Sequence, residues 1–166
     1  PPIVCLTLAK QKIHLHIYPT PYKPYKEYLD LAKAEPYFHF HQSASYKNII
    51  THISKYDFGL WYHEIDRGER AILAKEQTAI GNKIFTYIEA GLPVIVAQHL
   101  LYGAEITTKN KIGITITKNN FENFKKYCDK LNFKKEMETF QNTLSLQHQK
   151  YQLLNFYNLI INKNKT

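Results

Sequence analysis

The sequence lacks any apolar run of the roughly 18 residues that a membrane-spanning helix needs. Its longest candidate, residues 92–101, is interrupted by Gln98 and His99. The chain also has only two cysteines, Cys5 and Cys128, which form neither a zinc-binding pattern nor a disulfide framework. These shortages argue against a membrane span and a disulfide-stapled domain, and we expect two buried thiols in a reducing compartment.

The familiar glycine-rich and nucleophile motifs are missing as well. The sequence has no GxGxxG fingerprint, no Walker phosphate loop and no GxSxG nucleophile elbow. These absences argue against the common NAD-dependent, ATP-dependent and serine-hydrolase classes.

What is present fits one ordinary globular domain of 166 residues, with 44% hydrophobic and 22% charged residues. Because the chain begins with Pro1 rather than Met, we expect a fragment or a processed chain. The net charge of +8 comes from 22 basic and 14 acidic residues. This charge suits an anionic partner such as nucleic acid, a phosphate ligand or a membrane surface, although a basic surface can also simply serve solubility.

Short apolar runs alternate with amphipathic segments, which predicts an α/β fold with a mostly parallel six-stranded sheet and helices on both faces. The predicted strands are 3–8, 13–18, 37–41, 57–62, 93–97 and 111–117. The predicted helices are 25–34, 46–56, 82–90, 121–131 and 134–161, the last of them broken or bent. We expect 57–62 and 93–97 to be neighbouring central strands. Residues 63–80 form a long polar connection with room for a helix over 71–77.

One connection does not fit this scheme. Only residues 9–12 separate the first two apolar runs, whereas a parallel crossover needs about a dozen residues or more. The two runs could form an antiparallel pair or one bent strand, but we expect a missing helix-bearing connection between Ala9 and Lys12.

Histidines and aromatic residues each allow two interpretations. His14 and His16 share one face of a predicted strand, and His39 and His41 do so on the next. Four histidines could hold a metal, but no carboxylate or thiolate has ligand spacing, so we expect local hydrogen bonds and no metal site.

The 13 tyrosines and 9 phenylalanines could stack on nucleic acid bases. Core packing is the preferred interpretation, for example for the following side chains: Tyr46, Tyr56, Phe85 and Tyr87.

The most informative stretch runs from residue 56 to residue 96, where a strand, a long loop, a helix, Gly91 and another strand follow one another. Ligands of open parallel sheets bind beyond the carboxyl ends of the strands. The helix that starts near Asn82 presents free backbone N–H groups and a positive dipole end there. Lys83 adds a cation in the first turn, where it opposes the dipole unless an anion is bound. This pattern predicts a phosphate site.

The segments "KYDFGLWYHE" and "GNKIFTYIEAGLPVIV" resemble the carboxyl-terminal half of GT-B-fold glycosyltransferases of the bacterial group 1 type. Weaker similarity extends the resemblance over residues 13–117. It implies a Rossmann-like three-layer sandwich over residues 1–166, a single domain that binds a nucleotide-sugar donor, with a terminal helical segment over 134–161. The acceptor-binding amino-terminal domain is then missing from this chain.

The resemblance also implies which residues face the donor. Gln42 and Ser43 would face the base, and Asn82 and Lys83 the diphosphate. His63 and Glu64 would line the cleft, and Glu105 would lie on a loop that faces the donor sugar. The family carries glutamates at the positions of Thr86 and Thr78, and often proline at that of Gly81. Threonine holds a ribose hydroxyl less strongly than a carboxylate does. No catalytic residue and no cofactor is assigned.

The expected function is the donor-binding half of a glycosyltransferase that transfers sugar from a nucleotide-sugar to a cell-surface polysaccharide or lipid-linked acceptor, with the isolated domain inactive. The alternatives are an inactive nucleotide-binding module of the same fold and an unrelated basic α/β protein that binds nucleic acid; under the preferred interpretation nucleic acid is not a partner. The expected location is the cytoplasm, with an anionic membrane surface as a further partner. The apolar stripe of the last helix either awaits a partner or packs on its own sheet. Its members are Leu153, Leu154, Phe156, Tyr157 and Ile160.

Overall fold

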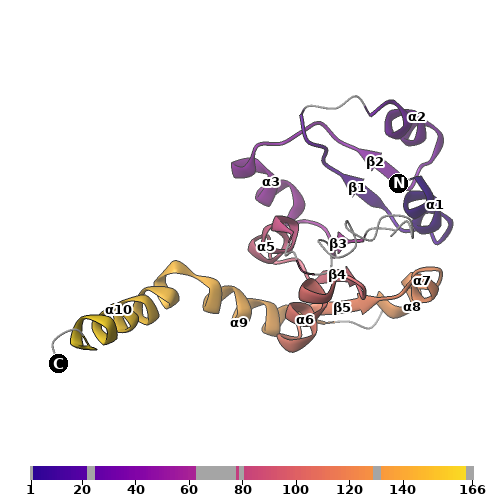
Figure 1. Cartoon of the computed structure of the whole chain (residues 1–166). Helices are drawn as coiled ribbons and strands as arrows, with labels where there is room; N and C mark the ends of the chain where they lie inside the picture. The colour runs from indigo at the N-terminus through magenta and orange to yellow at the C-terminus, as the bar shows by residue number, and fades with distance from the viewer. Residues whose placement is uncertain (1, 22–24, 63–77, 79–80, 129–131, 164–166) are drawn as a thin grey trace.

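The structure is a computed structural model that describes residues 2–21, 25–62, 78, 81–128 and 132–163. Parallel strands alternate with helices along the chain, as predicted for an α/β fold (Figure 1). The strands are β1 (Leu15–Ile17), β2 (Phe38–Phe40), β3 (Gly59–Trp61), β4 (Val94–Ala97) and β5 (Gly113–Ile116). The helices before β4 are α1 (Pro2–Lys10), α2 (Lys26–Ala34), α3 (Tyr46–Ile53) and α5 (Asn82–Glu89). Those after it are α6 (Leu101–Lys109), α7 (Lys118–Phe121), α8 (Phe124–Cys128), α9 (Lys134–Leu144) and α10 (Leu146–Lys163).

The described strands form two parallel sheets rather than the predicted sheet of six strands. β1 pairs with β2, and the other sheet has the order β3-β4-β5. Gly59 and Val94 are partners in the register of β3 and β4, so the prediction that these strands are neighbours is correct. β4 is central, but β3 lies at the edge of its sheet as the described residues define it, which corrects the expectation that both are central.

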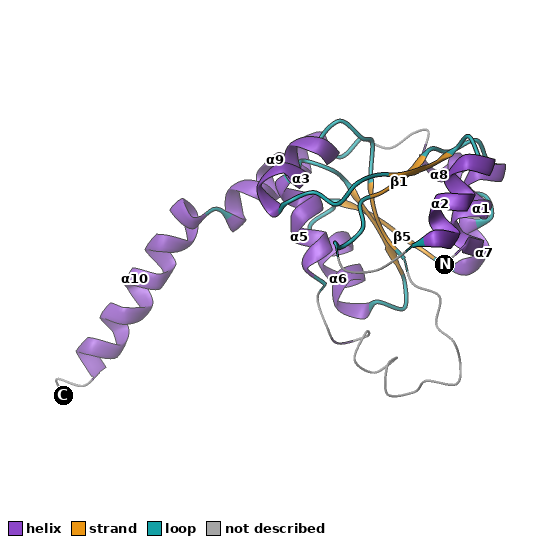
Figure 2. Cartoon of the chain, turned by 90° about the horizontal axis from the view of Figure 1, so that it is seen from above, coloured by secondary structure: helices purple, strands orange, loops and turns teal. Residues whose placement is uncertain are grey.

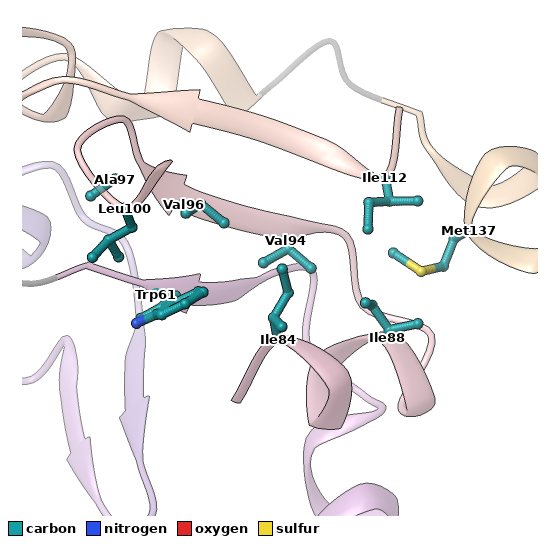
Figure 3. Packing of buried hydrophobic residues seen from close by; sticks show 9 residues of the cluster. All are labelled: Trp61, Ile84, Ile88, Val94, Val96, Ala97, Leu100, Ile112 and Met137. Atoms are coloured by element: carbon teal, nitrogen blue, oxygen red, sulfur yellow. The ribbon is translucent and has the colours of Figure 1, made fainter. Parts of the chain in front are cut away.

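The side chains of β4 alternate between two apolar clusters on opposite faces of the three-stranded sheet. Val94 and Val96 face the first cluster, to which α5 and α9 contribute Ile84 and Met137 (Figure 3). Ile95 faces the second, which includes side chains of α1, α7 and α8. Helices therefore cover both faces, and the sheet is the middle of three layers (Figure 2).

The first apolar run is a helix and not a strand, which is one reason for the smaller strand count. Val4 and Leu8 of α1 are buried in the second cluster, with the spacing of one helix face. A tight turn then leads directly into β1: the Lys12 N–H donates to Ala9 O at 2.8 Å, and Lys12 has a φ of 59°. The chain is thus continuous here, and the expectation of a missing connection is wrong because no strand crossover is needed.

The end of α5 follows its sequence signal. Gly91 has a φ of 75°, a conformation that glycine adopts without the steric cost of a Cβ atom, as expected for a residue just past a helix end. The Gln141 side chain of α9 donates to Ile88 O at 2.6 Å. One of the carbonyls left over at this helix end is therefore satisfied by a neighbouring helix.

The carboxyl-terminal third differs in detail from the prediction. The described part of 121–131 holds the short helix α8 and the last residue of α7, which begins earlier, at Lys118, because Thr117 caps a separate first turn by accepting from the Asn120 N–H at 3.2 Å. The predicted break in 134–161 is confirmed, since Ser145 is extended with a ψ of 142° between α9 and α10. α10 projects away from the domain (Figure 1), and all five residues of its predicted stripe are exposed. This exposure overturns the alternative in which the stripe packs on its own sheet.

None of the described helices is long and apolar enough to span a bilayer.

Candidate functional site

The candidate site lies at the edge where β3 and β4 end and where α5 and α6 begin. Because the three strands are parallel, their carboxyl ends share this edge. β3 ends at Trp61 and β4 at Ala97, after which the Gln98 N–H donates to Ile116 O at 2.8 Å. A cavity of about 790 Å³ lies at the opposite, amino edge, where Lys12, Asp57 and Pro93 line it, and is separate from this site.

Trp61 fixes the starts of both helices at this edge. Its ring is 5% exposed and lies between Gly81 and Gly103. A Cβ atom at Gly81 would lie 2.9 Å from Trp61 Cζ2, and one at Gly103 would lie 2.5 Å from Cζ3. Both distances are shorter than real Cβ contacts, so the indole requires glycine on both sides. This contact explains why position 81 is glycine in this chain.

The start of α5 carries positive charge that no acidic residue of its own first turn balances. Gly81 occupies the N-cap position with a ψ of 137°, no side chain caps the helix, and its first turn has no acidic residue. Asn82 and Lys83 are both exposed. Free backbone N–H groups, the helix dipole and an ammonium group therefore meet at one exposed helix end, an arrangement that favours a bound anion.

The predicted base-facing residues lie toward the other end of α5. Gln42 and Ser43 are exposed and lead from β2 into α3. The Tyr46 hydroxyl of α3 donates to Glu89 Oε2 at 2.7 Å, which ties the start of α3 to the end of α5. Because α5 has eight residues and rises about 1.5 Å per residue, its two ends are about 10 Å apart. The segment of Gln42 and Ser43 is thus linked to the end of α5 that lies opposite Asn82 and Lys83.

Thr86 and Glu89 of α5 already make hydrogen bonds within the domain. The hydroxyl of Thr86, which is half-buried, donates to Asn82 O at 3.2 Å. Glu89 accepts from Tyr46, and this hydrogen bond is the main reason that the pKa of Tyr46 is raised. Glu89 is therefore engaged at the end of the helix, away from its start. Thr78 is exposed.

Glu105 lies on a helix and not on the predicted loop. Gly103 and Thr107 face the core, so Glu105, two residues from each, lies on the opposite and exposed face of α6. The loop had been implied by the family resemblance. In the structure, the hydroxyl of Thr107 donates to Gly103 O at 2.7 Å and that of Thr108 to Ala104 O at 2.8 Å, within the helix.

His63 and Glu64 lie outside the described residues, as does the predicted helix over 71–77. Trp61 and His99 are at the candidate edge but are not among the residues that the resemblance places there. His99 follows β4 directly, is half-buried, and its ring contacts Tyr62 edge-on at 6.3 Å. Their position just past or at a strand end is the sequence signal that could have identified them.

The histidine pairs form the predicted local hydrogen bonds. His14 Nδ1 lies 2.7 Å from His39 Nε2, and His16 Nδ1 lies 2.9 Å from His41 Nε2.

The prediction that the aromatic side chains pack in the core is partly wrong, because Tyr46 is 69% and Phe85 40% exposed. By contrast, Tyr87 packs against the first cluster, and burial raises its pKa to about 12.

Comparison with known proteins gives one family. A family model described as "Glucosyltransferase 3-like, C-terminal domain" matches residues 6–154. No curated protein and no solved structure matches the chain. The predicted resemblance to the carboxyl-terminal half of a GT-B glycosyltransferase is thereby confirmed. The match covers most of the 166 residues, and the chain therefore belongs to the glucosyltransferase 3-like family, as its C-terminal domain.

Proposed function

We propose that this domain binds the nucleotide-sugar donor of a glycosyltransferase that extends a cell-surface polysaccharide or a lipid-linked acceptor. The observation that carries the proposal is the exposed start of α5, where Lys83 stands beside an uncapped helix end with no acidic residue in its first turn. Trp61 holds that helix start against the sheet, which gives the charge a fixed position.

The donor lies along α5 in this proposal. Its diphosphate contacts the backbone at Gly81 and Asn82 together with the ammonium group of Lys83. Its base extends toward Gln42 and Ser43, because the start of α3 is tied to the end of α5.

The remaining predicted residues surround the rest of the donor. Thr86 takes the place of the ribose-binding glutamate as a weaker partner. His63, Glu64 and Glu105 are assigned to the sugar side. Support for Glu105 is its exposure.

The chemistry proposed for this end of α5 is charge stabilisation. Glycosyl transfer breaks the bond between the sugar and the diphosphate, and negative charge develops on the departing diphosphate oxygen. Donors that are already in place at the helix end and on Lys83 stabilise that charge without reorganising during the reaction. The group that deprotonates the acceptor is not assigned to this chain.

The acceptor-binding amino-terminal domain is the proposed partner of α10. This helix exposes Leu153, Phe156 and Tyr157 by 54%, 57% and 54%, a stretch of apolar surface that soluble proteins normally cover. The isolated 166-residue chain is then expected to bind a nucleotide weakly and to transfer no sugar.

Two further proposals rest on single observations. Thr78 and Thr86, which replace carboxylates, favour an inactive nucleotide-binding module of the same fold as the second candidate function.

An anionic membrane surface is a proposed additional partner, supported by exposed lysines at the end of α8 and the start of α9. They are Lys125, Lys126, Lys134 and Lys135. The nucleic-acid alternative required an unrelated protein, and the family match removes its basis.

Calorimetry with a panel of nucleoside diphosphates tests the main proposal. Lys83→Ala is expected to weaken binding of the preferred diphosphate by about 1.5–3 kcal/mol, the range for hydrogen bonds to charged groups. Lys26→Ala is the matched control, because Lys26 is an exposed lysine in the first turn of α2. Absence of binding for every diphosphate would reject the proposal, and equal affinities of the two variants would remove Lys83 from the site. Binding without sugar transfer by the complete two-domain protein would favour the inactive module.

A further inference from the structure

A continuous stack of rings covers one face of the two-stranded sheet. His16 and His39 stack with their ring centroids 4.3 Å apart and their planes at 15°. His14 stacks on His39 at 5.0 Å, and His16 on His41 at 5.2 Å. With the two hydrogen bonds of 2.7 and 2.9 Å, these contacts join four imidazoles across β1 and β2.

Two tyrosines extend the stack beyond β1 and β2. Tyr56 stacks on His16 at 4.2 Å, and Tyr18 stacks on His41 at 4.4 Å. The hydroxyls of these tyrosines lie 2.9 Å apart. Tyr56 is three residues before Gly59, where β3 begins. The rings therefore link the two-stranded sheet to the chain entering the three-stranded sheet, whereas the described residues show no strand pairing between the two sheets.

The hydrogen bonds in this stack depend on the protonation of the imidazoles. A neutral imidazole has one donor and one acceptor nitrogen, whereas an imidazolium has two donors. Each histidine pair therefore keeps its bond only while at least one member is neutral. Protonated rings stacked at 4–5 Å would also repel each other at short range.

The groups that face His16 reinforce this dependence. His14 directly precedes β1, His39 lies in β2, His41 directly follows β2, and Lys55 follows α3; all four disfavour a charge on His16. Burial is the largest cause, and the pKa of His16 is lowered to about 4. Burial likewise lowers the pKa of His39 and His41, and on His41 the nearby Lys55 and His52 act in the same direction.

We propose that the ring stack of His14, His16, His39, His41, Tyr18 and Tyr56 is a pH-dependent latch, closed while its imidazoles are neutral and opened by their protonation. Opening loosens β1 and β2 on the face that carries the rings, while the apolar contacts of Ile13 and Leu15 with the second cluster remain. The test of the latch needs no nucleotide, so it can be carried out whether or not the donor proposal holds.

Hydrogen exchange of the full chain, corrected for the intrinsic pH dependence of exchange, tests the latch. Protection of amides in β1 and β2 is expected to fall by up to about tenfold for each pH unit between pH 6.5 and 5, as one linked proton requires. Protection of β4 is expected to stay constant. Equal losses in both sheets, or none in β1 and β2, would overturn the proposal.

Two variants and one measurement on the wild type complete the test. His16→Phe keeps a stacking ring but cannot be protonated, so the pH dependence of β1 and β2 is expected to weaken. His148→Phe on the exposed helix α10 is the control, and it is expected to leave the pH dependence of amide protection in β1 and β2 unchanged. Because His16→Phe could fail to fold, the imidazole of His16 is also titrated by NMR in the wild-type chain. A midpoint near 6.5 would overturn the latch, and one well below 6 would support it.

Discussion

Strand β4 of the three-stranded sheet is buried along its whole length, whereas β1 and β2 carry a row of imidazoles on one face. Val94, Ile95, Val96 and Ala97 are each at most 1% exposed and pack into apolar clusters on both faces of the sheet. The other sheet has two strands of three residues each, and titratable rings cover one of its faces. Apolar burial does not depend on pH, but a ring stack does. The chain thus joins regions whose stability responds to different conditions.

The largest change in stability is expected when the indole of Trp61, which packs beside the three-stranded sheet, is removed. Trp61→Ala should lower the free energy of unfolding by about 3–5 kcal/mol, because it removes a buried ring and leaves a cavity between α5 and α6. Urea unfolding followed by far-UV circular dichroism measures this. Tyr151→Ala is the control, since Tyr151 is 61% exposed on α10. Similar losses in both variants would contradict the comparison.

Adding a Cβ atom beside the indole of Trp61 should lower the free energy of unfolding by less than removing the indole does. Gly103→Ala places a Cβ atom 2.5 Å from Trp61 Cζ3, and overpacking of this kind costs about 1–3 kcal/mol. The same unfolding experiment applies, with Thr108→Ala as an exposed control on the same helix. A Gly103→Ala variant as stable as the wild type would mean that the indole is not held between the two glycines.

Acidification should weaken the two-stranded region by a smaller amount. The pKa of His16 is about 4 in the folded chain, below its ordinary 6.5, so the unfolded chain takes up the proton first as the pH falls. Stability is therefore complete above pH 6.5 and is lost progressively toward pH 4. Because His16 is half-buried and solvent screens its charge, we expect a loss of about 1–2 kcal/mol. Unfolding curves between pH 7.5 and 3.5 measure it, and a loss that begins only below pH 4 would implicate carboxylates instead.

The smallest effect is expected on α10, which belongs to neither sheet. Leu153→Gln and Phe156→Gln should change stability by no more than about 0.5 kcal/mol, since these side chains are 54% and 57% exposed. Thermal unfolding of the isolated chain measures this. A destabilisation above about 1 kcal/mol would show that α10 packs on the domain, and would weaken the proposal that it meets the acceptor-binding half.

The sequence predicted best where one local signal sufficed. The run of β4, the helix α5 and the glycine after it combine periodicity, length and a stop residue within one short segment. The first apolar run was harder to assign, because a run of six mostly apolar residues suits a buried strand or a buried helix equally well. Only the joint burial of Val4, Cys5, Leu8 and Ala9 identifies the helix. α6 was missed because the family resemblance implied a loop there; in the structure the hydroxyls of Thr107 and Thr108 donate to carbonyls of the preceding turn within the helix.

The candidate site likewise has a part that a local sequence signal predicts and a part that depends on the folded domain. Asn82 and Lys83 are predicted by the start of a helix, which is local information. The part played by Trp61 depends on Gly81 and Gly103, which lie 20 and 42 residues further along the chain and meet only in the folded domain. Tyr46 has helical spacing typical of a core residue but is exposed, because α3 turns it toward Glu89.

Trp61 is also the only tryptophan of the chain. Its near-ultraviolet absorption and its fluorescence therefore come from one position, the junction of β3, α5 and α6, against a background of tyrosines that can be avoided by excitation at longer wavelength. Any event that shifts the start of α5 changes the surroundings of this single fluorophore. The chain thus carries its own optical reporter at the proposed donor site, and binding there can be followed without an attached label.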